Sequence, residues 1–339
     1  MCSSDLIAMN ITIYDIAQKC HVSIATVSRV LNGSSRVSEK TRAKVLKVMK
    51  EMGYKPNPFA RGLGLDSMKI IGVICTDVAD IFYAHAVSLL EDGLRKHHFD
   101  VMLSNTGSDT GHNGKYISDM AGKHVDAIIT IGTPFSSESD VRLLCETARQ
   151  IPVITINSDY HQPRMYSVVC NERDGMKDVV AALANKGCQH ILYIYNSLTY
   201  SGRHKLDGFR QGIKELNLPH KAELIQQTPR TLTDTEALID RLVAGNVDFD
   251  AIVTSDDIFA VGAQRAALRH GLDIPVIGCN NSILAECATP TLTSLDNKLT
   301  NLCAAAVNIV TELTTKGADA VPIRTEFNAE LVERESFTT

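Results

Sequence analysis

Several features are missing from this chain of 339 residues. It contains no tryptophan, and aromatic residues make up only 5% of it. No apolar run approaches the roughly 20 residues that a membrane-spanning helix needs. Its first ten residues, MCSSDLIAMN, lack the basic start and the apolar segment of a signal peptide. These absences argue against a membrane protein and a secreted one, and we expect the chain to stay in the cytoplasm.

The cysteines form no recognisable metal or disulfide pattern. There are nine of them, an odd number, without a CxxC pair and without a His/Cys cluster at zinc spacing. In a cytoplasmic protein such cysteines are most simply reduced, small apolar side chains. We therefore expect neither a metal nor a cofactor.

Motifs for catalysis are also scarce. The chain has no GxSxG nucleophile turn and no GxxxxGK phosphate loop. The adjacent Asp256 and Asp257 could be interpreted as an acid/base pair, but Asp257 is more simply the cap of a helix at 258–271. The sequence thus predicts a protein that is not an enzyme. A solute-binding receptor, the other alternative, would need export.

The charges divide the chain into two unequal parts. Between Asn10 and Leu65 there are ten Lys/Arg and three Asp/Glu, a net charge of +7. The remainder holds 24 basic and 36 acidic residues, a net charge of −12. A small basic block on a large acidic body indicates a polyanion-binding module joined to a part with a different task.

The basic block has the pattern of a helix-turn-helix. Three helices are predicted, at 13–20, 24–32 and 39–52. Thr12, Ser23 and Ser38 stand at their N-cap positions, and Gly53 follows the last helix. About three residues separate the first two helices, which is the spacing of a unit that lays its second helix in the major groove of DNA.

The segment 56–68 is predicted to be a linker with helical potential. Asn57 could cap a helix that begins at Pro58 and continues through FARGL. So short a helix is marginal by itself and would need a partner to stay folded.

From Lys69 onward, short apolar runs alternate with amphipathic helices. The runs are 70–75, 100–105, 126–132, 153–157, 167–171, 191–196, 251–256 and 275–280. Continuous β-branched strands of this kind belong to parallel sheets covered by helices on both faces. Many runs end in polar residues: Thr76-Asp77, Ser104-Asn105, Asn157, Asn196, Ser255-Asp256 and Asn280-Asn281. Because open α/β sheets bind ligands at the carboxyl ends of their strands, these residues predict a polar cleft.

Five stretches together resemble one family of bacterial proteins. They are TIYDIAQKCHVSIATVSRVLNG, VSEKTRAKVLKVMKEMGYKPN, FARGL, IIGVICTDVADIFYA and TSDDIFAVGAQRAALRHG. The chain resembles the LacI/GalR family of transcription regulators, and its headpiece is most similar to the catabolite-control branch. The resemblance implies an all-α helix-turn-helix headpiece plus an α/β periplasmic-binding-protein-like core of two doubly wound parallel-sheet subdomains.

The resemblance also implies the domain boundaries. We expect a DNA-binding domain at 10–55, a hinge helix and linker at 56–68, and a ligand-binding and dimerisation core at 69–339. Within the core, the N-subdomain is expected at about 69–170 and 295–322, and the C-subdomain at about 171–294 and 323–339.

In such a headpiece the second helix reads base edges. Arg29 can bond O6 and N7 of guanine together, whereas Ile24 and Ala25 offer only apolar contact. In the hinge, Leu63 matches the leucine that the family wedges into the minor groove. The implied DNA-binding residues are Thr12, Ser23, Ile24, Ala25, Thr26, Ser28, Arg29, Asn32, Asn57, Arg61 and Leu63.

The core departs from the family at the cleft. Lys205 stands where the family has a sugar-binding Arg, and Asn157 and Asn280 stand at two common Asp positions. With Arg203 nearby, these changes make a sugar acid or sugar phosphate plausible beside a neutral sugar. The implied effector-binding residues are Asp80, Phe82, Tyr83, Asn157, Lys205, Ser255, Asp256 and Asn280.

The function implied is that of a sequence-specific regulator, a repressor of transcription. Its partners would be a pseudo-palindromic DNA operator, a small carbohydrate-type effector and a second copy of the chain. The absence of a C-terminal leucine heptad favours a homodimer over a tethered tetramer. One alternative stays open: the co-regulator could be a phosphorylated partner protein, as in the catabolite-control branch.

Overall fold

The computed structural model describes residues 11–31, 34, 36–54, 67–107, 113–160, 162–317 and 321–338. The chain forms two units, Met1–Lys69 and Ile70–Thr339, each with its own contacts. Most of the expected hinge, residues 56–66, lies outside the described residues. The same holds for four of the expected DNA-binding residues, Asn32, Asn57, Arg61 and Leu63.

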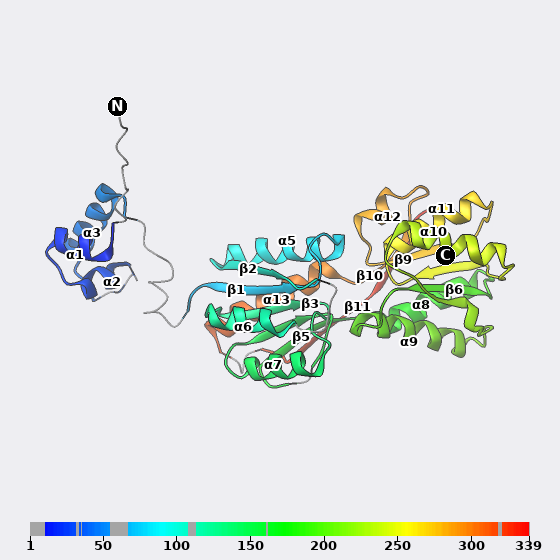
Figure 1. Cartoon of the computed structure of the whole chain (residues 1–339), viewed down its shortest axis with the longest axis horizontal. Helices are drawn as coiled ribbons and strands as arrows, with labels where there is room; N and C mark the ends of the chain where they lie inside the picture. Colours follow the sequence, from blue (N-terminus) through cyan, green and yellow to red (C-terminus); the bar gives the residue numbers. More distant parts are fainter. Residues whose placement is uncertain are drawn as a thin grey trace, which may run out of the picture. The chain divides into compact units, whose positions relative to one another are not determined.

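The first unit contains the three predicted helices, α1 (Ile13–Cys20), α2 (Ile24–Leu31) and α3 (Glu39–Met52) (Figure 1). They enclose a small apolar core of Ile16, Ala17, Cys20, Val27, Val30, Val37, Val45 and Met49. Burial of one face of each short helix stabilises what would be marginal alone. The prediction of a three-helix headpiece is confirmed.

Local hydrogen bonds close the ends of these helices as predicted. The Asp15 carboxylate accepts from both the backbone N–H and the hydroxyl of Thr12, each at 2.7 Å. Ser38 Oγ accepts from the N–H of Thr41 at 3.3 Å, and Gly53 ends α3 in the left-handed region at φ +66°. His21, in the turn between α1 and α2, also adopts a left-handed backbone with φ 52°. The turn therefore forms with a residue other than glycine in the left-handed conformation.

The second unit contains two sheets, and each belongs to one subdomain (Figure 1). The first sheet has the order β11 (Arg324–Asn328), β5 (Met165–Asn171), β4 (Val153–Ile156), β3 (Ala127–Ile131), β1 (Ile70–Cys75), β2 (Asp100–Asn105), and all its pairings are parallel. Helices α5 (Ile81–Lys96) and α13 (Leu299–Thr315) pack together on one face. Helices α6 (Gly114–Gly122) and α7 (Glu138–Ala148) cover the other face.

The second sheet repeats this plan. Its order is β12 (Glu330–Val332), β10 (Thr293–Asp296), β9 (Val276–Cys279), β8 (Ala251–Thr254), β6 (Ile191–Tyr195), β7 (Ile225–Gln227). The pairings are parallel except for β12, which runs antiparallel to β10. Helices α8 (Glu172–Asn185) and α9 (Tyr200–Glu215) cover one face, and α10 (Leu232–Ala244), α11 (Asp257–Arg269) and α12 (Ile283–Cys287) the other. The prediction of two doubly wound subdomains is confirmed.

All eight predicted apolar runs form strands, but the described residues contain four further strands that were not predicted from the sequence. These are β7, β10, β11 and β12. They are short and rich in polar residues, and β11 alternates exposed with half-buried positions, which is typical of an edge strand. In β10 the polar side chains are buried because they find partners: the Thr293 hydroxyl donates to the carbonyl of Phe337 at 2.6 Å.

One predicted subdomain boundary is wrong. Residues 323–339 were assigned to the C-subdomain, yet β11 pairs with β5 of the first sheet, with Phe327 opposite Cys170. The chain passes between the two subdomains three times: after β5, after β10 and after β11, which ends at Asn328. Only β12 and the residues that follow it return to the second sheet. The predicted boundary before residue 295 is also slightly early, because β10 of the second sheet continues to Asp296.

The part of the chain that the structure describes contains no helix with the length and apolar character of a membrane span.

Candidate functional site

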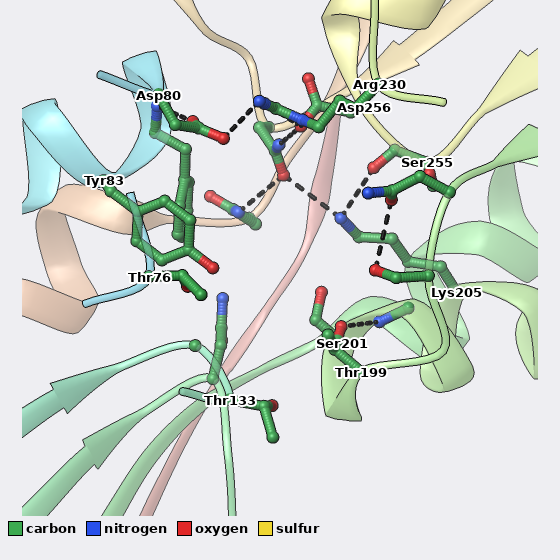
Figure 2. Close-up of a pocket in the computed structure, with 18 of the residues that line it drawn as sticks. Thr76, Asp80, Tyr83, Thr133, Thr199, Ser201, Lys205, Arg230, Ser255 and Asp256 are labelled. Atoms are coloured by element: carbon green, nitrogen blue, oxygen red, sulfur yellow. Dashed lines mark hydrogen bonds and ion pairs between the residues drawn. The ribbon is translucent and has the colours of Figure 1, made fainter. Parts of the chain in front are cut away.

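A cleft of about 460 Å³ lies between the two subdomains, at the carboxyl ends of their strands (Figure 2). Its walls carry hydroxyl, amide and charged groups with two aromatic rings. The lining residues are Thr76, Asp77, Asp80, Phe82, Tyr83, Gly132, Thr133, Asn157, Asn196, Ser197, Thr199, Ser201, Gly202, Lys205, Arg230, Ser255, Asp256, Asn280 and Asn297. All eight residues expected to bind an effector are among them.

Some expectations about strand ends do not hold. Ser104 and Asn105 end β2 at the edge of its sheet and do not line the cleft, and Asn281 lies outside it as well. Conversely, Arg230 and Asn297 line the cleft but were not predicted. Arg230 lies between β7 and α10, and because β7 has no apolar run, no strand-end signal pointed to it.

The ammonium charge of Lys205 is already paired within the protein. Its ammonium group contacts Glu172 Oε1 at 3.3 Å, the carbonyl of Ser255 at 3.0 Å and Asn280 Oδ1 at 3.2 Å. The contact with Glu172 is an ion pair, and the other two contacts are hydrogen bonds that occupy two of the three N–H donors of the ammonium. Arg203 is exposed and is not part of the lining. The idea that Lys205 and Arg203 attract an acidic ligand is therefore not supported by their contacts.

Arg230 forms the charged end of the cleft instead. Its Nη2 and Nε donate to Asp256 Oδ2 at 2.7 and 3.3 Å, and its Nη1 pairs with Asp80 Oδ2 (Figure 2). Burial raises the pKa of Asp80, while the positive charge of Arg230 acts in the opposite direction. Asp80 belongs to the first subdomain and Asp256 to the second, so Arg230 links the two across the cleft.

Both carboxylates are held by helix starts. Asp80 is the N-cap of α5, and its Oδ1 accepts from the N–H of Phe82 at 2.8 Å. Asp256 is the N-cap of α11, and its Oδ1 accepts from the N–H of Ile258 at 3.1 Å. The prediction that Asp257 caps this helix is wrong, since Asp257 is already its first helical residue.

Asp257 is buried away from the cleft and serves the fold. Its carboxylate accepts from the N–H and hydroxyl of Ser282 at 2.7 and 2.8 Å and from the hydroxyl of Ser294 at 2.6 Å. Burial raises the pKa of Asp257 to about 6, although these hydrogen bonds favour the ionised form. Gly278 makes room for it, because a Cβ there would lie 2.2 Å from Asp257 Oδ1.

The two asparagines at the common Asp positions shape the backbone as well as the cleft. Asn157 has φ 54° and Asn280 has φ 94°, both in the left-handed region that asparagine tolerates better than most residues. Asn157 Oδ1 accepts from the N–H of Cys170 at 3.2 Å. Asn280 Nδ2 donates to Asp256 Oδ2 at 3.0 Å, and Asn297 Nδ2 donates to Asn280 Oδ1 at 3.0 Å. Much of their hydrogen-bonding capacity is thus already used within the protein.

An aromatic wall completes the cleft on the side of the first subdomain. Phe82 and Tyr83 meet edge to face with ring centroids 5.3 Å apart. Burial raises the pKa of Tyr83, so its hydroxyl stays protonated and can donate a hydrogen bond. Ser201 and Thr199 lie on the opposite wall (Figure 2). The cleft therefore offers an apolar surface together with many neutral donors and acceptors.

The headpiece presents the start of α2 to solvent. Ser23, Ile24, Ala25 and Arg29 are exposed, whereas Thr26 and Ser28 are half-buried. Ser23 caps the helix by accepting from the N–H of Thr26 at 3.1 Å, and the two hydroxyls lie 2.9 Å apart. Within the described part of the chain, no partner holds the Arg29 side chain.

Comparison with known proteins identifies the family. Residues 12–57 match the model of bacterial regulatory proteins of the lacI family, and residues 180–337 match that of the periplasmic binding protein-like domain. An HTH-type transcriptional regulator of Lachnoclostridium phytofermentans is 41% identical, with 96% of this chain and 98% of that protein aligned. The chain belongs to the lacI family. It is therefore a DNA-binding transcription regulator with a ligand-binding domain, and not an enzyme.

Two further proteins are similar to this lacI-family regulator over most of its length. The catabolite control protein A of Priestia megaterium is 30% identical, over 91% of this chain and 94% of that protein. The solved structure of the lac repressor dimer bound to operator and the anti-inducer ONPF has the same fold, with a TM-score of 0.85 and 24% identity over 96% and 98% of the two chains.

Proposed function

We propose that this regulator represses transcription as a homodimer on a pseudo-palindromic operator, and that a small carbohydrate in the cleft switches its affinity for DNA. The observation that carries the proposal is the cleft itself: a polar cavity with an aromatic wall, formed by both subdomains of a chain that also has a DNA-binding headpiece.

The headpiece contacts are proposed from exposure and chemistry. Arg29 would bond the O6 and N7 atoms of a guanine, and Ile24 and Ala25 would contact bases through apolar groups. The hydroxyls of Ser23, Thr26 and Ser28, with Thr12 at the start of α1, would donate to phosphates and position the module. For Asn32, Asn57, Arg61 and Leu63 the proposal rests on the family resemblance.

A carbohydrate suits the cleft because of its chemistry. Sugar rings have hydroxyl groups that both donate and accept, matched here by Thr, Ser and Asn side chains, and apolar faces that pack against aromatic rings such as Phe82 and Tyr83. A ligand that touches both subdomains binds one relative arrangement of them more tightly than another. Linkage then requires that DNA affinity change with ligand concentration.

Gel-shift titration tests this proposal. The operator is first selected from random DNA with the purified chain, and carbohydrates are then added to the protein–DNA complex. We expect one sugar, added alone, to shift the apparent Kd for operator DNA by at least about fivefold, a typical coupling between sites. Binding of DNA that no sugar alters would contradict the proposed switch.

A second candidate is a switch operated by a phosphorylated partner protein. The relative named catabolite control protein A, 30% identical over most of the chain, favours it. In the same titration this mechanism would appear as a change in DNA affinity that needs the phosphorylated form of a partner protein and occurs without any sugar.

A further inference from the structure

Three charged side chains, Asp80, Arg230 and Asp256, form a cluster at one end of the cleft (Figure 2). The two oxygens of each carboxylate have different partners. Oδ1 of each caps a helix, while Oδ2 of each faces Arg230. The guanidinium is thus fixed by rigid helix starts from both subdomains and has little freedom to reorient.

The fixed guanidinium retains donors for a ligand. A guanidinium has five N–H groups. Two of them bond Asp256 Oδ2, from Nε and Nη2, and one at Nη1 bonds Asp80. One N–H at Nη1 and one at Nη2 have no partner among the described residues, and the side chain is 28% exposed where it lines the cleft. Two N–H groups on neighbouring nitrogens can bond two neighbouring oxygen atoms of a ligand.

The charges of the cleft oppose an anionic ligand. Its charged lining residues, as far as the structure describes them, are Asp77, Asp80, Asp256, Lys205 and Arg230, a net charge of −1. Lys205 is in addition paired with Glu172, which is buried beside it. A carboxylate or phosphate that reached Arg230 would have to approach Asp80 and Asp256, whose side chains are only 9% and 15% exposed and therefore poorly screened.

An independent observation points to a ligand that donates a hydrogen bond. Asn297 lines the cleft, its side chain is almost completely buried, and its Oδ1 has no hydrogen-bond partner among the described residues. Its amide nitrogen is occupied by Asn280, which in turn donates to Asp256. An unsatisfied buried acceptor is costly unless a donor fills it. A hydroxyl group of a ligand would supply that donor.

We infer that the charged cluster selects a neutral carbohydrate with two adjacent hydroxyl groups. Arg230 donates its two remaining N–H groups to the two hydroxyl oxygens, and Asp80 Oδ2 accepts one of the hydroxyl protons, since Asp256 Oδ2 already accepts from Arg230 and Asn280. The same two carboxylates exclude acidic and phosphorylated sugars. Arg230 is thus a specificity-determining residue of the cleft. The inference rests on the proposed function, because it takes the cleft to be the effector site.

Isothermal titration of the full chain tests this selection. The probes are glucose, galactose, xylose and cellobiose as neutral sugars, with gluconate, galactonate and glucose 6-phosphate as their anionic counterparts. R230K keeps the positive charge but loses the planar fork, and R230Q loses both. The matched control is R203Q, since Arg203 is exposed, donates to the carbonyl of Leu198 and does not line the cleft.

We expect the wild type to bind a neutral sugar more tightly than its acid or phosphate. R230K and R230Q should weaken that binding by about 10- to 100-fold, the effect of losing hydrogen bonds from a charged donor. R203Q should bind like the wild type. D80N and D256N, which keep a helix-capping side chain, should change the neutral-to-anionic affinity ratio by at least about tenfold in favour of the anion.

Four results would count against this assignment. If R230K and R230Q both bind the neutral sugar as the wild type does, or if the wild type prefers an anionic sugar, the inference is overturned and the proposed function stands. If D80N and D256N each lower the affinities for neutral and anionic sugars by the same factor, the two carboxylates have a structural role only, and the inference is also overturned. If no sugar of either class binds, the proposed function fails and the inference fails with it.

Discussion

Asp257 illustrates how one residue can serve the fold while its neighbour serves the cleft. Asp256 points toward Arg230 at the cleft, whereas Asp257 turns into the second subdomain and accepts three hydrogen bonds from Ser282 and Ser294. Adjacent residues at a helix start diverge in direction, so the pair cannot act on one substrate as an acid and a base.

The buried position of Asp257 predicts a pH dependence of stability. Its pKa is about 6 in the folded chain against a usual value of 3.8, so the folded state binds the proton more tightly. This contribution is complete below pH 3.8 and is lost as the pH rises through 6. From pH 5 to pH 7 the wild type should lose about 1 kcal/mol of unfolding free energy that Asp257→Asn does not lose. Urea unfolding of both proteins at the two pH values measures this, and equal losses would refute it.

Arg29 carries a second prediction at the scale of the residue. If it reads a guanine, Arg29→Ala should lose about 1–3 kcal/mol of discrimination between operator and mutated operator, with a smaller change on random DNA. Gel shifts on the three DNAs measure the difference. An equal loss of affinity on all of them would identify Arg29 as a phosphate contact.

The headpiece helices could be predicted from the sequence, whereas several edge strands could not. The helices of the headpiece have caps and apolar spacing within a few residues, so α1, α2 and α3 were predictable. The edge strands β7, β11 and β12 are short and polar, and they become strands because a neighbouring strand supplies the hydrogen bonds. The apolar-run criterion cannot find such strands.

The end of α3 provides a prediction at the scale of the element. Gly53 adopts φ +66°, and a Cβ there would meet no atom, so Gly53→Ala introduces backbone strain and no clash. We expect α3 to lose about 1 kcal/mol, seen as amide exchange about five times faster in mass spectrometry of the full chain. The control is Gly122→Ala in α6, where a Cβ also meets nothing but φ is not left-handed. Its helix should exchange no faster than in the wild type.

At the scale of the whole molecule, the small basic block and the large acidic core have separate tasks. The headpiece carries the positive charge that attracts DNA, while the core holds the cleft. A single headpiece contacts too little DNA for tight, specific binding, so two are needed. This is the physical reason for proposing a dimer.

The dimer has two measurable consequences. Light scattering during size exclusion should give about twice the chain mass of 37.0 kDa. Removing one half-site from the selected operator should weaken binding by about 100-fold or more, because several base contacts are lost together. A mass of one chain at working concentration, or unchanged binding to a half-site, would contradict the proposed assembly.

The sequence by itself determined the three headpiece helices, the eight apolar strands and the family, and it placed eight residues that line one cleft. The helices and strands follow from local patterns, since helix caps and apolar spacing are encoded within a few residues, whereas the eight cleft residues were implied by the resemblance to the family. Tertiary structure alone decided which charges meet. Lys205 is occupied by Glu172, Ser255 and Asn280, while Arg230 bridges Asp80 and Asp256 from distant parts of the chain. Such partners meet only when distant parts of the chain pack together, within the second subdomain for Lys205 and across the cleft for Arg230 and Asp80, and no local pattern records them.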